Sequence, residues 1–349
     1  MRLERRTETP LALALSAPLI AVAIALALSG VLIAIAGANP LQAYYEMLKG
    51  AFGSRLSISE TLTRTTPLVL TGLAAAVAFR SRLWNIGGEG QFYVGALCAA
   101  WLGHSIAAVL PPVLAIPVMM IAGMIAGALL LLGPVILRIR FGVDEVVTTL
   151  LLNFIVLLFV SMMIEGPLKD PLAFGWPQSV AVSNDVMLPK LLSRSRLHIG
   201  LLIAIAAAII IYVVQSRTVF GVKSRAAGLN AAAASFAGVS LGSTLLVVAC
   251  ISGALAGLAG AIEVTGLKGY VTLDLSPGYG YSGIVVAMLA GLNPLGVVAT
   301  ALFVAIVFVG ADSMSRAMGV PSFIADVIVS ISLLTMLVCL LFTTYRVRR

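Results

Sequence analysis

Charged side chains are scarce in this sequence. Only 10% of its 349 residues are Asp, Glu, Lys or Arg, whereas 60% are hydrophobic. Because a soluble domain carries about 25% charged residues, this chain lacks the polar surface that a water-soluble protein of its length requires. The composition therefore predicts that most of the chain is surrounded by lipid.

Cysteine and histidine are also rare. The three cysteines, Cys98, Cys250 and Cys339, lie far apart in apolar runs and form no CxxC pair, which argues against a disulfide framework and a metal site. The two histidines, His104 and His198, lie near the ends of apolar runs. A lone histidine in such a place is more often structural than catalytic. We therefore expect neither a metal nor a cofactor.

The sequence patterns of nucleotide-hydrolysing enzymes are missing as well. The dipeptide Gly-Lys does not occur, so there is no phosphate-binding loop of the GxxxxGK[ST] type. No nucleophile–base constellation is visible, and we expect no catalytic residue. The net charge of +8 would favour nucleic acid as the partner of a soluble protein. Here the basic residues cluster between apolar runs, as they do in membrane loops, so we expect no nucleic-acid binding.

The chain contains ten apolar runs, and a helix needs about 20 apolar residues to cross a bilayer. The sequence therefore predicts an all-α membrane protein of about ten transmembrane helices that form a single domain over residues 1–349. The expected spans are 11–36, 58–79, 91–110, 113–135, 146–164, 198–215, 243–262, 281–292, 295–311 and 323–343. The eighth run is too short to cross alone, so it either extends back through Tyr279 or is half of a broken helix.

Lysine and arginine placement predicts the orientation of these spans. With both termini in the cytoplasm, the inner segments hold 13 basic residues and the outer segments hold 8. This positive-inside bias favours cytoplasmic termini in a bacterial inner membrane. The first run is too long for a cleaved signal peptide. On the outer side, residues 39–52 suit a short interfacial helix, and residues 165–197 form the longest loop, a candidate contact for an external partner.

Small residues four positions apart indicate closely packed helices. Gly123 and Gly127 form one GxxxG pair, and Gly253 and Gly257 form another, which Gly260 follows. Such spacing lets two helix backbones approach closely in lipid. The pattern predicts a packed bundle and carries no information about a substrate.

Rare polar groups within the apolar chain are candidates for the translocation pathway. Asn85, Glu89 and Gln91 belong to a glycine-containing segment that joins the second and third expected spans, and Asn153 lies within the fifth. Irregular backbone at membrane depth persists only where protein or a water-filled cavity satisfies it. Two readings stay open for the segment: a pore-lining turn, or an ordinary cytoplasmic loop followed by a helix N-cap.

The inner segment 216–242 is long and rich in alanine, which favours helix. Its small side chains would let a short helix settle into a groove on another protein. The alternative is a helix that lies in the lipid headgroups, but that needs large apolar residues along one face. Only Leu229 and Phe236 meet this requirement, so we favour docking to a partner.

Three motifs and the opening of the chain resemble one known family. TVFGVKSRAAGLNAAA (218–233), LWNIGGEGQ (83–91) and GYGYSGIVVAMLAGLNPLG (278–296) are similar to motifs of permeases from ABC importers of the ribose and branched-chain amino-acid class. NPLQAYY (39–45) resembles the nucleoside branch, which carries nucleosides or simple sugars. The resemblance implies a permease bundle like that of type II ABC importers, with a short cytoplasmic coupling helix at about 225–235.

The resemblance also implies partners and roles. It implies a cytoplasmic ABC ATPase, a second permease that is a different chain, an extracytoplasmic substrate-binding lipoprotein and the surrounding membrane lipid. ATP binding to the ATPase would pull on the inner segment and open the pathway alternately to the two sides of the membrane. The residues implied in ATPase coupling are Arg225, Ala226, Ala227, Gly228, Leu229, Asn230 and Ala231.

Other transport mechanisms remain as alternatives. A secondary transporter would need ion-coupling acids deep in the spans, for which Glu60 and Glu263 are the candidates. A channel or a purely structural membrane protein is a second alternative, and saturable flux would argue against it. An intramembrane enzyme is the third, and the missing catalytic constellation argues against it.

Overall fold

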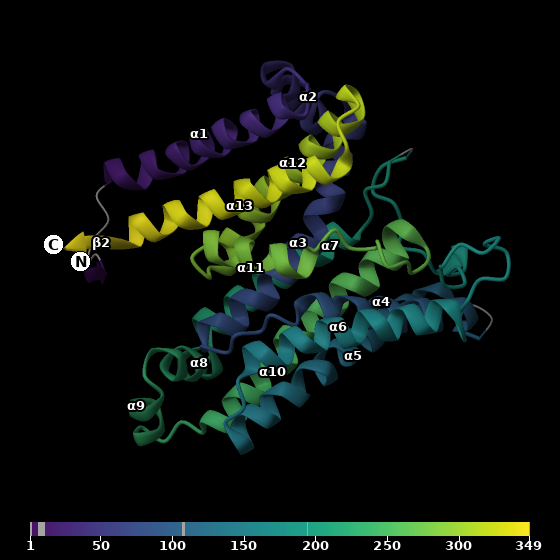
Figure 1. Cartoon of the computed structure of the whole chain (residues 1–349). Coiled ribbons are helices and arrows are strands. Elements are labelled where there is room, and N and C mark those ends of the chain that lie inside the picture. Colours follow the sequence, from purple (N-terminus) through teal and green to yellow (C-terminus); the bar gives the residue numbers. More distant parts are fainter. Residues whose placement is uncertain (1, 6–10, 107–108, 194, 349) are drawn as a thin grey trace. The chain divides into compact units, whose positions relative to one another are not determined.

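The computed structural model describes residues 2–5, 11–106, 109–193 and 195–348, and nearly all of its regular structure is helical (Figure 1). The chain divides into two compact units: residues 1–61 with 303–349, and residues 62–302. The helices α3 and α12 contribute to both units. Each unit is described by itself below.

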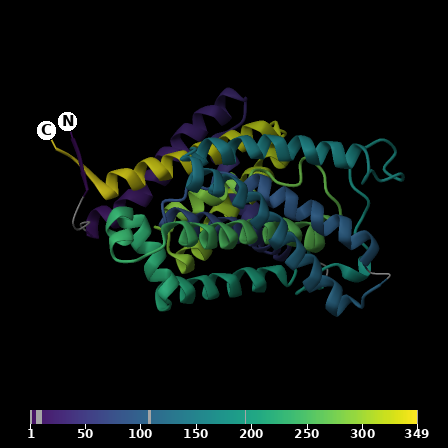
Figure 2. The same cartoon turned by 90° about the horizontal axis from the view of Figure 1, so that it is seen from below.

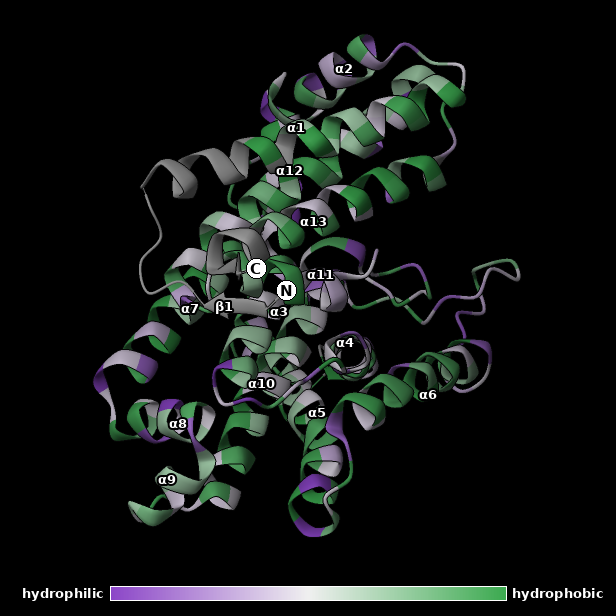
Figure 3. Cartoon of the chain, turned by 60° about the vertical axis from the view of Figure 1, so that its left-hand side comes forward, coloured by the Kyte–Doolittle hydropathy of each residue, from purple (hydrophilic) through white to green (hydrophobic). Residues whose placement is uncertain are grey.

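The unit of residues 62–302 contains most of the helices. Their bounds are α3 (Arg55–Arg80), α4 (Gly88–Ser105), α5 (Pro112–Phe141), α6 (Glu145–Glu165), η2 (Asn184–Val186), α7 (Gly200–Arg217), α8 (Val219–Leu229), α9 (Ala231–Phe236), α10 (Leu241–Glu263), the π-helical η3 (Val264–Lys268), α11 (Tyr279–Leu289) and α12 (Pro294–Met318). In this unit α4, α5, α6 and α10 lie side by side (Figures 1 and 2). Most residues of these helices are hydrophobic (Figure 3), and α5 and α6 carry many exposed large hydrophobic side chains, which suits contact with lipid.

Glycines bring α4, α5 and α10 into backbone contact. A Cβ built on Gly257 would lie 2.2 Å from the carbonyl oxygen of Gly123, and one on Gly127 would lie 2.3 Å from that of Gly253. Helix α10 also meets α4, because a Cβ on Gly260 would lie 1.9 Å from the carbonyl oxygen of Phe92. No side chain fits at these distances, so both expected GxxxG pairs are used within this chain, where they allow the close helix approach that lipid-embedded bundles rely on.

The inner segment forms two short helices where the resemblance implies one. The hydroxyl of Thr218 caps α8 by accepting from Gly221 N (3.2 Å), and the side chain of Asn230 caps α9 by accepting from Ala233 N (3.1 Å). Asn230 itself has an extended backbone. Asparagine prefers the N-cap to the helix interior, and this preference divides the expected helix at 225–235 into the end of α8 and most of α9.

The unit of residues 1–61 and 303–349 contains α1 (Leu11–Ile35), α2 (Pro40–Phe52), α13 (Ser322–Thr344), β1 (Arg2–Arg5) and β2 (Tyr345–Arg348), with the ends of α3 and α12. Within this unit α1 packs along α13, and β1 pairs antiparallel with β2. The ribbon is a small exception to the all-α expectation. Asn39 begins α2 by accepting from Leu41 N (3.0 Å), and the chain bends by 115° between α1 and α2.

Helices occupy all ten ranges that the sequence predicts to be spans, but not all of them are long and apolar enough to cross a bilayer. Among the described residues six helices meet that requirement, or seven if the bent α1–α2 pair counts as one. The eighth range corresponds to α11, which begins at Tyr279 as one alternative expected. Its 11 residues reach only about 16 Å at 1.5 Å per residue, roughly half of the bilayer core.

Candidate functional site

An irregular stretch joins α3 to α4 inside the unit of residues 62–302. It covers residues 81–87, and with the first turn of α4 we call residues 81–91 the α3–α4 segment. Glu89 and Gln91 were expected in the connecting loop, but the helix begins at Gly88, so both lie in its first turn. Asn85 lies in the irregular part. All three side chains are buried.

One face of α6 supplies the hydrogen-bond partners of this segment. Glu145, Thr149 and Asn153 are four residues apart, so their side chains point the same way. A carboxylate oxygen of Glu145 accepts from Trp84 N (3.3 Å), and the hydroxyl of Thr149 accepts from Ile86 N (3.3 Å). The segment therefore runs along about 12 Å of α6, at 1.5 Å per residue.

Asn153 completes this row of contacts. Its side-chain oxygen accepts from Gly90 N (2.8 Å), and its amide donates to Ile86 O (2.9 Å) and to the hydroxyl of Tyr281 (3.1 Å). The residue is fully buried. Irregular backbone at membrane depth needs such partners because water is absent there.

A pair of side-chain amides fixes the segment to α10. Asn85 and Gln91 each donate an amide hydrogen to the side-chain oxygen of the other, and both distances are 2.9 Å. Asn85 also donates to the hydroxyl of Ser252 (3.0 Å), which in turn donates to Ala74 O (2.7 Å). Three helices are thereby connected through one asparagine.

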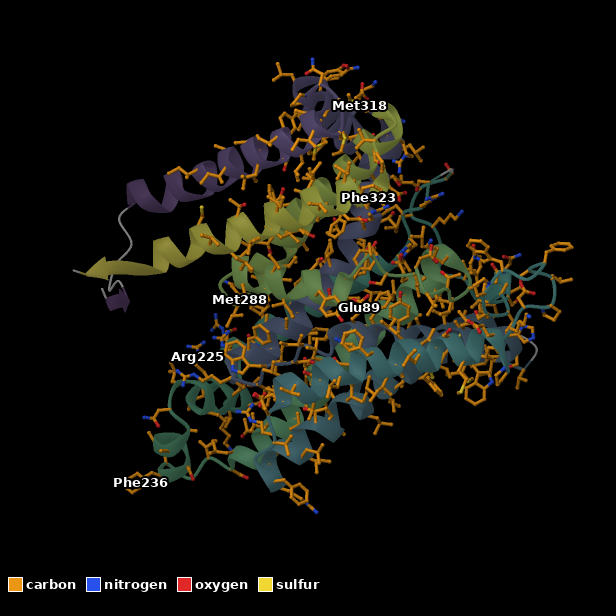
Figure 4. All side chains as sticks on the ribbon, in the orientation of Figure 1. Glu89, Arg225, Phe236, Met288, Met318 and Phe323 are labelled. Carbon is orange, nitrogen blue, oxygen red and sulfur yellow. The ribbon has the colours of Figure 1, made fainter. Side chains whose placement is uncertain are left out.

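Glu89 connects the start of α4 to the start of α11. Its carboxylate accepts from the backbone N–H of Gly280 (2.7 Å), and a Cβ on Gly280 would lie only 2.2 Å from Glu89 N. The two helices therefore begin in direct contact. A carboxylate at helix N-termini is stabilised by their positive ends, which offsets part of the cost of burying its charge. Figure 4 labels this side chain, which is buried within the unit.

The four expected pathway residues thus belong to one hydrogen-bonded arrangement. Asn85, Glu89, Gln91 and Asn153 are all buried, and the hydrogen bonds above go to groups of this chain. Sequence reasoning missed Glu145 and Thr149, which accept from the segment backbone at Trp84 and Ile86. Their spacing from Asn153 has the period of one helix face.

The end of the α3–α4 segment at Ser81 contacts α8. The hydroxyls of Ser81 and Ser224 are 2.6 Å apart, and both side chains are buried. A Cβ on Gly228 would lie 2.1 Å from Arg80 O, so α8 touches the backbone at the end of α3. The Arg80 guanidinium donates to the side-chain oxygen of Gln215 on α7 (2.7 Å).

The residues expected to couple to an ATPase divide into two groups. Ala227 and Gly228 are buried within this chain, whereas the side chain of Arg225 is exposed, and Ala226 between them is half-buried. At the junction of the two helices Leu229, Asn230 and Ala231 are also exposed. Only the exposed residues are available to another protein.

A comparison with protein families matches residues 57–345 to the permease component of branched-chain amino acid transport systems. The chain belongs to this family of ABC transporter permeases. The permease is 35% identical to a guanosine ABC transporter permease of Bacillus subtilis over 92% of each chain. It is 34% identical to a nucleoside ABC transporter permease of Lactococcus lactis over 89% of its own length and 87% of the relative. A glucose ABC transporter permease of Haloferax volcanii is also 34% identical, over 99% and 93% of the two chains.

No solved structure matches the permease. Its family and apolar helices make it a multi-pass membrane subunit of an ATP-driven importer rather than an ion-coupled transporter, channel or intramembrane enzyme. The family works with ATPase and substrate-binding partners, and ATP is hydrolysed on a separate subunit.

Proposed function

We propose that the permease carries nucleosides or related sugar-containing solutes. Two of the three relatives described above are named for guanosine or nucleosides and the third for glucose. A nucleoside contains a sugar, so one class of pathway suits all three. The resemblance of residues 39–45 to the nucleoside branch favours nucleosides among them.

Uptake by the assembled importer tests this substrate class. The permease is produced with its ATPase, second permease and binding protein in a host that lacks nucleoside uptake, and entry of radiolabelled guanosine, uridine and glucose is measured. We expect saturable, ATP-dependent uptake of nucleosides, with competition by other nucleosides and weak competition by free bases. Uptake of glucose alone would contradict the nucleoside assignment, and uptake that persists after ATP depletion would contradict the mechanism.

The proposed assembly places a cytoplasmic ABC ATPase against the exposed part of α8 and α9. Phe236 is 97% exposed and Leu229 is 70% exposed. Leu229 belongs to the motif at 218–233 that resembles the coupling region of the family, and Phe236 follows it within the segment 216–242. A fully exposed Phe in a segment that is otherwise rich in alanine is typical of a docking anchor. The exposed side of Arg225–Ala231 supports the same role, while Ala227 and Gly228 hold α8 to the rest of the chain.

The remaining partners follow the family pattern. We propose a second, different permease chain beside this one and a substrate-binding lipoprotein at the outer loop 165–197. About ten helices cross the inner membrane, with α11 as an incomplete span. The pairing of β1 with β2 supports an arrangement with both termini on one side, and the basic residues favour the cytoplasm. Asn85, Glu89, Gln91 and Asn153 lie in the wall of the pathway.

A single substitution tests the docking surface. Phe236→Glu places a charge where an apolar contact with the ATPase is proposed, so co-purification of the ATPase with the permease should fall at least tenfold, within the range of a hot-spot residue. Phe174→Glu in the outer loop is the matched control, because this Phe is also fully exposed. Equal ATPase recovery with both variants would contradict the assignment.

A further inference from the structure

The α3–α4 segment contacts α8 at one end and α11 at the other. Its residues were proposed above for the pathway wall, but the connection between the two helices has a second possible use. We propose that it is a rigid link that carries a displacement of α8 to the beginning of α11. Ser81 and Ser224 are then positioning residues for transport. The inference rests on the proposed function, because it needs an ATPase that moves α8.

The contact between the start of the α3–α4 segment and α8 leaves α8 little room to slide. The hydroxyls of Ser81 and Ser224 are 2.6 Å apart, and Gly228 has no space for a Cβ because Arg80 O would be 2.1 Å away. Close-packed protein contacts transmit displacement instead of absorbing it. A movement of α8 therefore displaces residues 80 and 81 with it.

Hydrogen bonds along α6 and α10 make the middle of the link stiff. The backbone N–H groups of Trp84, Ile86 and Gly90 are all bound to side chains of α6. The reciprocal amide pair of Asn85 and Gln91 closes the segment on itself. The bonds at Gly90, Asn85 and Gln91 are buried, whereas those at Trp84 and Ile86 are partly buried. An irregular segment of this kind moves as a unit, because breaking one of its buried bonds leaves an unsatisfied polar group.

The far end of the link meets a short, separate helix. Glu89 accepts from Gly280 N (2.7 Å), in the first turn of α11. Left-handed residues bound this helix at both ends: Gly278 has φ 85°, and Gly291 and Leu292 both have φ 59°. Backbone bends of this kind are where hinges absorb a rotation. Helix α11 is thus the element that a pull on Glu89 would reorient.

The test uses the assembled importer in proteoliposomes and measures solute transported per ATP hydrolysed. In the double variant Ser81→Ala/Ser224→Ala, this ratio should fall roughly fivefold to tenfold, the scale of one lost buried hydrogen bond, while ATP hydrolysis continues. The control is Ser240→Ala/Ser243→Ala, which removes a second serine pair (3.1 Å) from the same inner region. An unchanged ratio in the first variant would overturn the inference.

A disulfide between positions 81 and 224 should restore the coupling that the loss of the two serines removes. In a background without the three native cysteines, Ser81→Cys/Ser224→Cys should be uncoupled when reduced and should regain at least half of the wild-type ratio when oxidised to a disulfide. A link that moves as one body tolerates this bond. If oxidation instead blocks transport, the two residues must separate during the cycle, and the rigid link is excluded.

Amide hydrogen exchange measures directly whether a change at α8 reaches α11, even if a variant transports poorly. A non-hydrolysable ATP analogue should change exchange in residues 216–236, 81–91 and 278–284 of the wild-type complex. In Ser81→Ala/Ser224→Ala the change at 216–236 should remain and that at 278–284 should disappear. A change at 278–284 that persists would refute the link. Absence of ATP-driven uptake by the wild-type complex would instead reject the proposed function.

Discussion

Two regions of the same unit pack in opposite ways. Between α5 and α10 the helices meet through close backbone approach at Gly123, Gly127, Gly253 and Gly257. The α3–α4 segment is instead held by buried side-chain hydrogen bonds.

The difference shows which contacts can change during transport. Glycine contacts depend on shape alone, because any separation loses the packing that holds helices together in lipid. Hydrogen bonds are directional and tie the residues of the α3–α4 segment to one another, so this segment can move as one piece. We infer that the contact between α5 and α10 stays unchanged during transport, and that the α3–α4 segment moves as one body and reorients α11.

The largest effect should come from filling the glycine interface. In Gly260→Ala the new Cβ would lie 1.9 Å from Phe92 O, and since the obstacle is backbone, α4 and α10 must separate. Overpacking costs about 1–3 kcal/mol, and we expect the upper end here. Thermal unfolding in detergent, followed by size-exclusion chromatography, should show a Tm lower by several degrees and a reduced monodisperse fraction.

Gly242→Ala is the control for this change. Gly242 lies in the first turn of α10, and a Cβ built on it would lie 3.6 Å from the Ile139 side chain, an ordinary van der Waals distance. Alanine favours helix over glycine by about 0.5–1 kcal/mol, so this variant should keep or slightly raise the Tm. A similar loss of Tm in both variants would mean that the α4–α10 contact does not cause the destabilisation.

The glycine interface was largely foreseeable from the sequence, and the polar segment was foreseeable only in part. GxxxG spacing is local, so the glycines of α5 and α10 can be recognised without knowing their partners. Hydropathy located the helices for the same reason, because each run carries its own signal, but not their ends: α12 ends at Met318 rather than at 311. The break at Asn230 was missed, although an asparagine before a run of alanines is an N-cap signal.

The partners of Asn85 and Glu89 could not be read from local pattern. Ser252 and Gly280 lie 167 and 191 residues away from them in the chain. A single serine or glycine in an apolar helix has many possible roles, and only the three-dimensional arrangement selects one. The row of polar residues at 145, 149 and 153 could have been predicted from the sequence, because its four-residue period marks one helix face.

The second largest effect should come from Asn153. Asn153→Leu keeps the size of the side chain but leaves Gly90 N and Ile86 O without their partner. Each unsatisfied buried group costs about 1–3 kcal/mol, so the Tm should fall and uptake should be lost. Leu151→Ala, on the exposed face of the same helix, should change neither by much. If Asn153→Leu transports normally, the segment does not depend on α6.

The smallest effect should come from Glu145, which lies at the periphery of the hydrogen-bonded polar region. Its carboxylate accepts from Arg138 (2.5 Å) and from Trp84 N (3.3 Å), and the Arg138 side chain is 29% exposed. In Glu145→Gln an amide oxygen still accepts from both groups, and solvent screens the lost charge. A partly exposed ion pair contributes about 1 kcal/mol or less.

The coupling between these two residues is measured with Glu145→Gln, Arg138→Gln and the double variant. We expect a coupling free energy below about 1 kcal/mol that shrinks as salt is raised, with uptake reduced less than in Asn153→Leu. This order would show that substitutions in the polar region have effects on Tm and uptake that decrease gradually from its core to its edge. In the glycine interface, by contrast, one added carbon is enough to cause a large loss of Tm. A Glu145→Gln variant as damaged as Asn153→Leu would mean that the charge at 145 holds the whole segment, and the distinction between edge and core would then be wrong.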